Sequence, residues 1–205
     1  MPQGFPPVAA ENARVLVLGT MPSVLSLEKT QYYGNPQNAF WRILFSLWDR
    51  PLPDSYEERV AFVREKRIAL WDVLRECERK GSADAAIRQP EPNDFAALAI
   101  RCPGLEAVFF NSQGAANLYK RLVRPDPLAL LPKVTLPSTS PARAMAGPGA
   151  GTARRFEDRR KGKKSSLKTG RFRENSRKIP SFLLRGTGGK CYSRYIIFIP
   201  MGKGD

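Results

Sequence analysis

The sequence predicts an α/β domain built on a small, four-stranded parallel sheet that is flanked by helices. Short apolar runs alternate along residues 8–146 with stretches whose apolar residues recur at helical spacing. The runs are rich in leucine and β-branched residues, as buried parallel strands are. A chain of 205 residues, 42% of them hydrophobic, is also long enough to bury the core of one such domain.

Four apolar runs are expected to form the sheet, and they cover residues 13–18, 68–73, 105–110 and 133–136. The helices between them are expected over residues 38–48, 56–62, 94–100 and 113–122, the third with Asp94 as its N-cap. In an open parallel sheet the ligand site lies beyond the carboxyl ends of the strands. The loops that follow these four runs are therefore the place to look for function.

Basic residues are concentrated near the carboxyl end of the sequence. The chain has 34 Lys and Arg against 19 Asp and Glu, a net charge of +15, and residues 151–205 hold 16 of the basic and 4 of the acidic residues. We therefore divide the chain into an N-terminal extension (1–7), an α/β domain (8–146) and a basic tail (147–205). The tail fits a disordered solvated segment, a nonspecific DNA-binding arm, or a divergent or out-of-frame terminus.

Several classes of function are excluded by composition. The sequence has no histidine, which excludes His-ligated zinc and Ser-His-Asp hydrolysis. Cys77, Cys102 and Cys191 are far apart and form no metal-binding or disulfide pattern, so we expect a reducing, cytoplasmic location and no metal. No secretory signal is recognisable, and the late apolar run 195–200 is too short to cross a bilayer, so we expect no membrane partner.

Polar and turn-forming residues follow the expected strands. The segments are G-T-M-P-S at 19–23, Y-Y-G-N-P-Q-N-A-F-W at 32–41, N-S-Q-G at 111–114 and L-P-S-T-S-P-A-R at 136–143. Glycine and proline fix sharp turns there, while Ser, Thr and Asn supply small hydrogen-bonding groups close to the backbone. Such loops suit contacts with phosphates and bases and contain no obvious nucleophile with a base beside it.

Taken in this order, the segments resemble the uracil-DNA glycosylase superfamily, and most closely its hypoxanthine-DNA glycosylase branch. The resemblance covers about residues 8–146 and implies a three-layer α/β sandwich. It also implies a monomeric DNA repair enzyme that flips a deaminated base out of single- or double-stranded DNA and hydrolyses its N-glycosidic bond. The expected base is hypoxanthine, with uracil as a second substrate, and no cofactor is needed.

The resemblance also assigns candidate catalytic residues. Many members of the superfamily carry Asp or Asn before the proline of the first turn to orient the attacking water, but Met21 stands there in this chain. The branch uses a later asparagine, for which Asn38 is the best match and Asn35 the alternative. From local sequence alone, Asn38 also fits an N-cap for a helix that begins at Ala39.

Four residues are candidates for binding the flipped base: Tyr33, Asn111, Met21 and Phe40. The resemblance implies that Tyr33 stacks on the base and that Asn111 reads its edge, where an amide can both donate and accept a hydrogen bond. Ordinary burial of Tyr33 and a strand-end turn at Asn111 are the alternatives. The helical spacing around Phe40 favours a place in the core.

DNA-backbone contacts are expected from the first and last loops. Ser138, Thr139 and Ser140 resemble the superfamily's second motif, Arg143 follows as a phosphate contact or wedge, and Ser23 contributes from the first loop. A plain proline-bounded turn would give the same spacing.

Four further residues match the branch's pattern, but we expect them to serve as a strand-end cap and in loop hydrogen bonds. They are Trp71, Asp72, Ser82 and Asp84. The alternative to an enzyme is a catalytically inactive DNA-binding module of the same fold, suggested by Met21 and by the unusual tail.

Overall fold

The structure is a computed structural model that describes residues 2–141. Its centre is a four-stranded sheet of strand order β2-β1-β5-β6, in which every neighbouring pair is parallel. The strands are β1 (Val15–Gly19), β2 (Ile68–Asp72), β5 (Ala107–Phe110) and β6 (Lys133–Thr135). The predicted α/β fold class and the four-stranded parallel sheet are confirmed.

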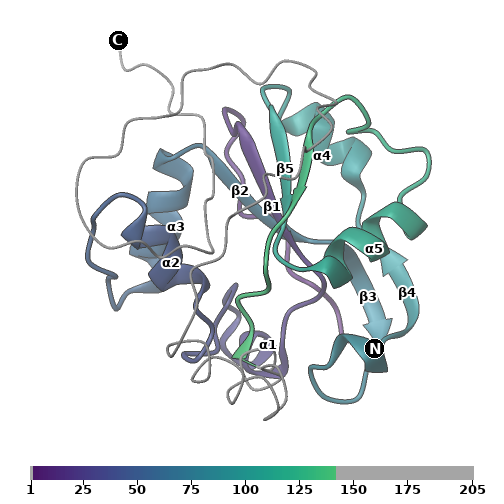
Figure 1. Ribbon diagram of the computed structural model, residues 1–205, viewed down its shortest axis with the longest axis horizontal. Coiled ribbons are helices and arrows are strands. Elements are labelled where there is room, and N and C mark those ends of the chain that lie inside the picture. The colour runs from purple at the N-terminus through teal and green to yellow at the C-terminus, as the bar shows by residue number, and fades with distance from the viewer. Residues whose placement is uncertain (1, 142–205) are drawn as a thin grey trace, which may run out of the picture. The chain divides into compact units, whose positions relative to one another are not determined.

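Helices cover both faces of this sheet. In Figure 1, α2 and α3 lie on one side of the strands, and α4 and α5 lie on the other. The α-helices are α1 (Val24–Lys29), α2 (Phe40–Ser46), α3 (Tyr56–Glu65), α4 (Phe95–Arg101) and α5 (Gln113–Leu122). This arrangement is typical of a sheet whose successive strands are joined by right-handed crossovers in both directions from β1.

Buried apolar side chains fill both layers between helices and sheet. All five residues of β2 are buried, and so are the first four of β1. On one side the rings of Phe45 and Phe62 stack with centroids 4.2 Å apart. On the other side Tyr119 of α5 packs edge-on against Phe95, at 5.0 Å. These contacts make the sheet a rigid support for the loops at its ends.

Helix ends follow the capping residues expected from the sequence, with one shift. Asp94 accepts the Ala97 N–H at 2.9 Å and caps α4 as predicted. The predicted helix after Asn38 begins later, at Phe40, because Ala39 occupies the N-cap position and offers no side-chain acceptor. Asn38 instead accepts the Phe40 N–H through Oδ1 at 2.9 Å, in an Asx-type turn before the helix.

Several short elements were not predicted from the sequence. They are the helix α1, the 3-10 helix η1 (Asp84–Ala86), and an antiparallel pair formed by β3 (Leu74–Glu78) and β4 (Arg88–Pro92). Strand β4 contains two prolines, Pro90 and Pro92, which remove backbone donors and conceal a strand pattern. Its register against β3 is irregular, as the prolines require.

The N-terminal residues run along the outer edge of β2. Val8 exchanges two backbone hydrogen bonds with Leu70, at 2.9 and 3.0 Å, in an antiparallel bridge. The carbonyl of Phe5 accepts the indole N–H of Trp71 at 3.0 Å. The residues expected as an extension thus contact the sheet directly.

No helix among the described residues is long and apolar enough to cross a membrane. The expected tail, residues 147–205, lies outside the described residues, as does Cys191.

Candidate functional site

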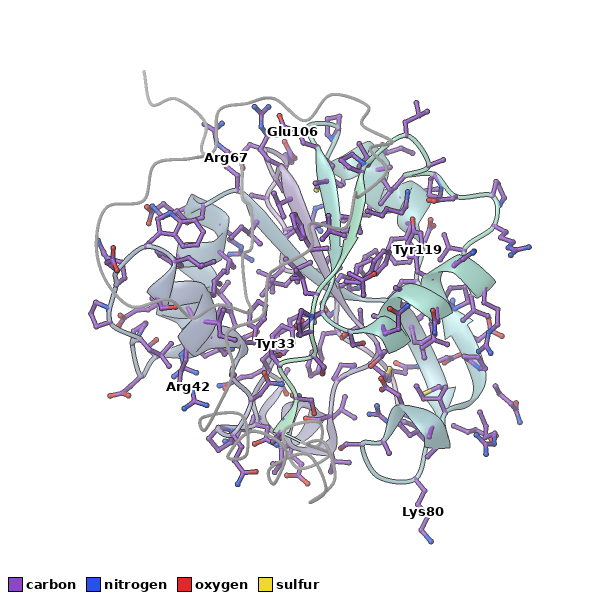
Figure 2. All side chains as sticks on the ribbon, in the orientation of Figure 1. Tyr33, Arg42, Arg67, Lys80, Glu106 and Tyr119 are labelled. Atoms are coloured by element: carbon purple, nitrogen blue, oxygen red, sulfur yellow. The ribbon has the colours of Figure 1, made fainter. Side chains whose placement is uncertain are left out.

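The carboxyl ends of three neighbouring strands bring together residues that are far apart in sequence. Gly19 is the last residue of β1, its partner Asp72 is the last residue of β2, and Asn111 follows β5. Asn111 is 7% exposed and its N–H donates to the carbonyl of Leu18 at 2.8 Å, so its position is fixed from the sheet. Figure 2 places Tyr33 near this end of the strands, whereas Arg67 and Glu106 lie at the opposite end.

Tyr33 joins an aromatic stack to this polar cluster. Its ring lies on Phe40 with centroids 3.8 Å apart and planes 17° apart, and its backbone has a positive φ of 53°. The side chain is half-buried, but its hydroxyl is buried and has no hydrogen-bond partner among the described residues. Burial and the nearby Asp72 carboxyl raise the pKa of Tyr33, so the phenol stays neutral. The Asn111 side chain acts on this pKa in the opposite direction, so it is close to the hydroxyl. Tyr33 therefore places a buried polar group beside the cluster, while its side chain as a whole is half-buried.

Phe40 is 4% exposed and also contacts Trp41 edge-on, with centroids 5.1 Å apart. These contacts are those of a core residue that supports Tyr33. Met21 is likewise buried, at 6% exposure, in the loop after β1. Ser23 in the same loop is the N-cap of α1, where its Oγ accepts the Ser26 N–H at 3.2 Å.

Asn38 and Asn35 lie in one loop and each makes a local turn. The Asn35 side chain accepts the Gln37 N–H at 2.9 Å, and its carbonyl accepts the Asn38 N–H at 2.9 Å. The bond from Phe40 N–H to Asn38 Oδ1 orients the Asn38 amide. It leaves the Nδ2 group and the second Oδ1 lone pair available to another partner.

The loop that follows β6 ties the catalytic candidate to the base-reading candidate. The Thr139 carbonyl accepts the Ala39 N–H at 3.0 Å, next to Asn38, and the Thr139 hydroxyl accepts from Asn111 Nδ2 at 2.9 Å. Ser138 Oγ accepts the Ser140 N–H at 3.2 Å and stiffens the same turn. The structure thus brings the 32–41 loop, Asn111 and residues 138–140 into one network. Arg143 lies outside the described residues.

The residues expected in loop hydrogen bonds mostly have that role. Ser82 Oγ accepts the Val24 N–H at 3.0 Å, and Asp84 accepts the Thr20 hydroxyl at 2.8 Å. Asp72 is different, because its Oδ2 atom is buried and has no partner among the described residues. The prediction of a simple strand-end cap was therefore wrong for Asp72. Its position after an apolar strand was visible in the sequence, but its lack of a partner was not.

A cavity beside α5 lies away from this end of the sheet. It has a volume of about 440 Å³ and is lined by residues that include Tyr119, Lys120 and Asp126, and none of the site residues named above borders it. Within residues 2–141, no group of three or more Cys, Asp or Glu side chains is placed to hold a metal ion.

Comparison with known proteins defines the class to which this fold belongs. The chain aligns with the solution NMR structure of a proposed uracil DNA glycosylase from Methanosarcina acetivorans. The TM-score is 0.61 and the identity 38%, over 71% of this chain and 89% of that one. The fold is therefore that of a uracil-DNA-glycosylase-type α/β protein.

Curated relatives narrow the class to a family. The chain is 39% identical to a protein named hypoxanthine DNA glycosylase from Methanosarcina barkeri, and 42% identical to one of the same name from Methanosarcina acetivorans. Each match spans 123 residues, 60% of this chain and 77% of the relative. No family model matches the chain. The protein belongs to the hypoxanthine DNA glycosylase family, as its sequence motifs predicted.

Proposed function

We propose that the protein removes hypoxanthine from DNA by flipping the deoxyinosine nucleotide out of the helix and hydrolysing its N-glycosidic bond. Family membership makes it a DNA glycosylase with DNA as its substrate. The proposal depends above all on one observation: the Thr139 links join the Asn38 loop to Asn111 at the carboxyl ends of the strands. A ligand at a sheet of this type binds at that edge. Uracil is proposed as a second substrate.

The reaction needs little acid or base power from the protein. The C1′–N9 bond breaks with its electron pair on the departing purine, the water oxygen bonds to C1′, and the base gains a proton overall. Because the sugar becomes positively charged as the bond breaks, a site can act by holding a water molecule and favouring that charge. This chemistry is consistent with a chain that contains no histidine.

Each candidate residue has a role in this scheme. Asn38, whose amide is oriented by the Phe40 N–H, positions the water, and Asn35 is the alternative on the same loop. Tyr33 stacks on the flipped base, a contact worth about 1–3 kcal/mol. Asn111 hydrogen-bonds to the edge of the base. Met21, which is buried in the loop after β1, is the fourth base-binding candidate, and Phe40 stacks against Tyr33.

The DNA backbone is proposed to bind at the loops around this site. Ser138, Thr139 and Ser140 supply hydroxyl and N–H groups to phosphates, with Ser23 from the first loop and Arg143 beyond the turn. In this scheme residues 8–146 form the catalytic domain and the basic tail adds nonspecific affinity for DNA. We further propose that the protein acts as a monomer, in the cytoplasm, on single- or double-stranded DNA.

The test is cleavage of labelled oligonucleotides that contain one deoxyinosine or one deoxyuridine, followed by alkali to break the strand at abasic sites. The full chain should cleave at deoxyinosine, and Asn38→Ala should lose at least a hundredfold in single-turnover rate. Asn117→Ala is the matched control, because Asn117 is an exposed asparagine on α5 whose side chain accepts a hydrogen bond from Gln113 Nε2.

Two results would count against the proposal. Intact strands after incubation with a chain that binds DNA and has a folded circular-dichroism spectrum would favour the inactive DNA-binding module. Full activity in Asn38→Ala would move the water-positioning role to Asn35, and Asn35→Ala should then lose the activity.

A further inference from the structure

Unsatisfied polar groups gather at one place in the molecule. Among residues 2–141, three buried side-chain nitrogen or oxygen atoms have no hydrogen-bond partner: the Tyr33 hydroxyl, Asp72 Oδ2 and Arg79 Nε. The Asp72 carboxyl and the Tyr33 hydroxyl lie beside the same point over Gly19, and Arg79 is close enough for its charge to act on Asp72. Buried polar atoms are nearly always paired, so these three atoms are candidates for contact with a bound polar group.

Sheet register places the Asp72 carboxyl directly over Gly19. These two residues are partners across β1 and β2, and a Cβ atom at Gly19 would lie only 2.4 Å from Asp72 Oδ1. The same point is 3.7 Å from the Tyr33 hydroxyl. Glycine at this position therefore makes room for the carboxyl group beside Tyr33. The carboxyl lies at the edge of the sheet where the base is proposed to bind.

The charged groups around Asp72 do not compensate its carboxylate for the loss of water on burial. Burial raises the pKa of Asp72 to about 7, Arg79 opposes this rise and Asp84 adds to it. Tyr32 and Tyr33 face the carboxyl from the 32–41 loop and are neutral phenols. Arg79 is partly engaged elsewhere, since its NH2 group donates to the Pro22 carbonyl. The carboxyl is therefore protonated in acidic solution and loses its proton close to neutrality.

We propose that Asp72 is a base-recognition residue whose carboxylic acid pairs with the lactam edge of the flipped base. This inference rests on the proposed function. In hypoxanthine the edge is N1–H beside C6=O, and in uracil it is N3–H beside C4=O. A carboxylic acid offers the complementary pair, since its O–H donates to the base carbonyl and its C=O accepts the base N–H. An ionised carboxylate accepts the N–H but places a negative charge against the base carbonyl.

This pairing explains why a buried acid is placed here. An asparagine amide can form the same pattern, but it does so at every pH. With Asp72 paired to the lactam edge, the second Nδ2 hydrogen of Asn111, beside the one that donates to Thr139, can still donate to the second lone pair of the base carbonyl. Asp72 makes base recognition dependent on its proton, so activity should fall as the pH rises through about 7. Because uracil carries the same lactam pattern, the proposed second substrate would pair with Asp72 in the same way.

The test compares pH profiles of single-turnover cleavage at deoxyinosine for the wild-type chain, Asp72→Asn and Asp72→Ala. Wild type should be fastest near pH 6 and slow by about tenfold by pH 8.5. Asp72→Asn keeps a donor and an acceptor and should have a flat profile. Asp72→Ala should lose about tenfold to a hundredfold at pH 6, as expected for two lost hydrogen bonds. Glu106→Gln, which removes a half-buried carboxylate that pairs with Arg14 at the opposite end of the sheet, should match wild type.

A second substrate shows whether Asp72 touches the lactam edge. 2′-Deoxynebularine carries purine, which lacks both O6 and the N1–H. At pH 6 the single-turnover cleavage rate should fall when deoxynebularine replaces deoxyinosine. This fall should be about fivefold larger for wild type than for Asp72→Ala. Circular dichroism of each variant checks that it is folded.

The outcomes separate this inference from the function on which it rests. Two results would show that Asp72 does not read the base in a chain that cleaves deoxyinosine. One is a wild-type pH profile in Asp72→Asn, and the other is an equal loss of cleavage rate on deoxynebularine for wild type and Asp72→Ala. If the folded wild-type chain cleaves deoxyinosine at no pH, the proposed function itself is wrong.

Discussion

Two aspartates, Asp126, which is half-buried, and Asp72, which is buried, show how differently this molecule treats a carboxyl group. Asp126, beside α5, accepts hydrogen bonds from the Tyr119 hydroxyl at 2.5 Å and the Leu128 N–H at 2.9 Å, and pairs with Lys133 at 3.1 Å. Burial alone would raise the pKa of Asp126, but these bonds lower it. Asp72 is more deeply buried, at 5% exposure, and its Oδ2 has no partner among the described residues.

The difference separates a group that stabilises the fold from one that costs stability. A satisfied carboxylate such as Asp126 holds the loop before β6 against α5. An unsatisfied one favours the neutral acid, and its ionisation works against folding. Proteins retain such groups mainly where a ligand uses them. The following predictions test that contrast, from the largest expected effect to the smallest.

Asp72→Asn should stabilise the protein at pH 8, by up to about 4 kcal/mol. The folded pKa of about 7 lies above the ordinary value of 3.8, so the stability of wild type is full below about pH 4 and falls between pH 4 and 7. The variant should show little of this fall. Urea unfolding at pH 4 and pH 8 measures it, and an equal effect of the substitution at the two pH values would contradict the contrast.

Gly19→Ala should cost about 1–3 kcal/mol of stability and at least tenfold in cleavage rate, because its Cβ would overlap Asp72 Oδ1. Gly104→Ala is the control, since its Cβ would meet only ordinary contacts, the nearest at 3.6 Å to the Ala13 carbonyl. Thermal unfolding and single-turnover cleavage would be measured on both. Equal behaviour of the two variants would show that the space over Gly19 has no role.

Asp126→Asn should destabilise the protein by about 1–3 kcal/mol at pH 7 without changing the cleavage rate of the folded enzyme. Because the pKa of Asp126 is lowered, its contribution is present above the ordinary aspartate range and is lost as the pH falls. The cost of the substitution should therefore shrink toward pH 3. This is the opposite pH trend to that of Asp72, and urea unfolding across the same range would detect it.

The smallest effects on stability are expected from removing the hydroxyl groups of the two tyrosines that lie beside these aspartates. Tyr119→Phe loses the bond to Asp126 and should cost about 1–2 kcal/mol. Tyr33→Phe removes a hydroxyl that has no partner among the described residues and should change stability by less than about 0.5 kcal/mol. Since Phe keeps the stacking ring, cleavage should stay within about threefold of wild type.

Local sequence predicted the sheet because β1, β2 and most of β5 are buried and read as continuous apolar runs. Asp94 and the start of α5 were predicted equally well, since their capping residues act locally. Strand β4 was missed because Pro90 and Pro92 conceal it, and the six-residue helix α1 is too short for a periodic signal.

The candidate site was predicted in part. Asn111 and Thr139 were found because they follow strands in recognisable motifs, and the structure joins them by a hydrogen bond. Asp72 was assigned a local cap, since the end of a strand does not reveal whether a carboxyl group will find a donor. That depends on Gly19, Tyr33 and Arg79, which come from three other parts of the chain.

The bridge between Val8 and Leu70 has a consequence for how the molecule behaves among its own copies. Strand β2 is an edge strand of the sheet. Without this bridge, its outer edge would present free backbone donors and acceptors, to which strands of other chains can hydrogen-bond. Two hydrogen bonds from the N-terminal segment occupy the middle of that edge. A variant that lacks residues 1–9 should therefore form oligomers or aggregates, detected by light scattering, at concentrations where the full chain does not.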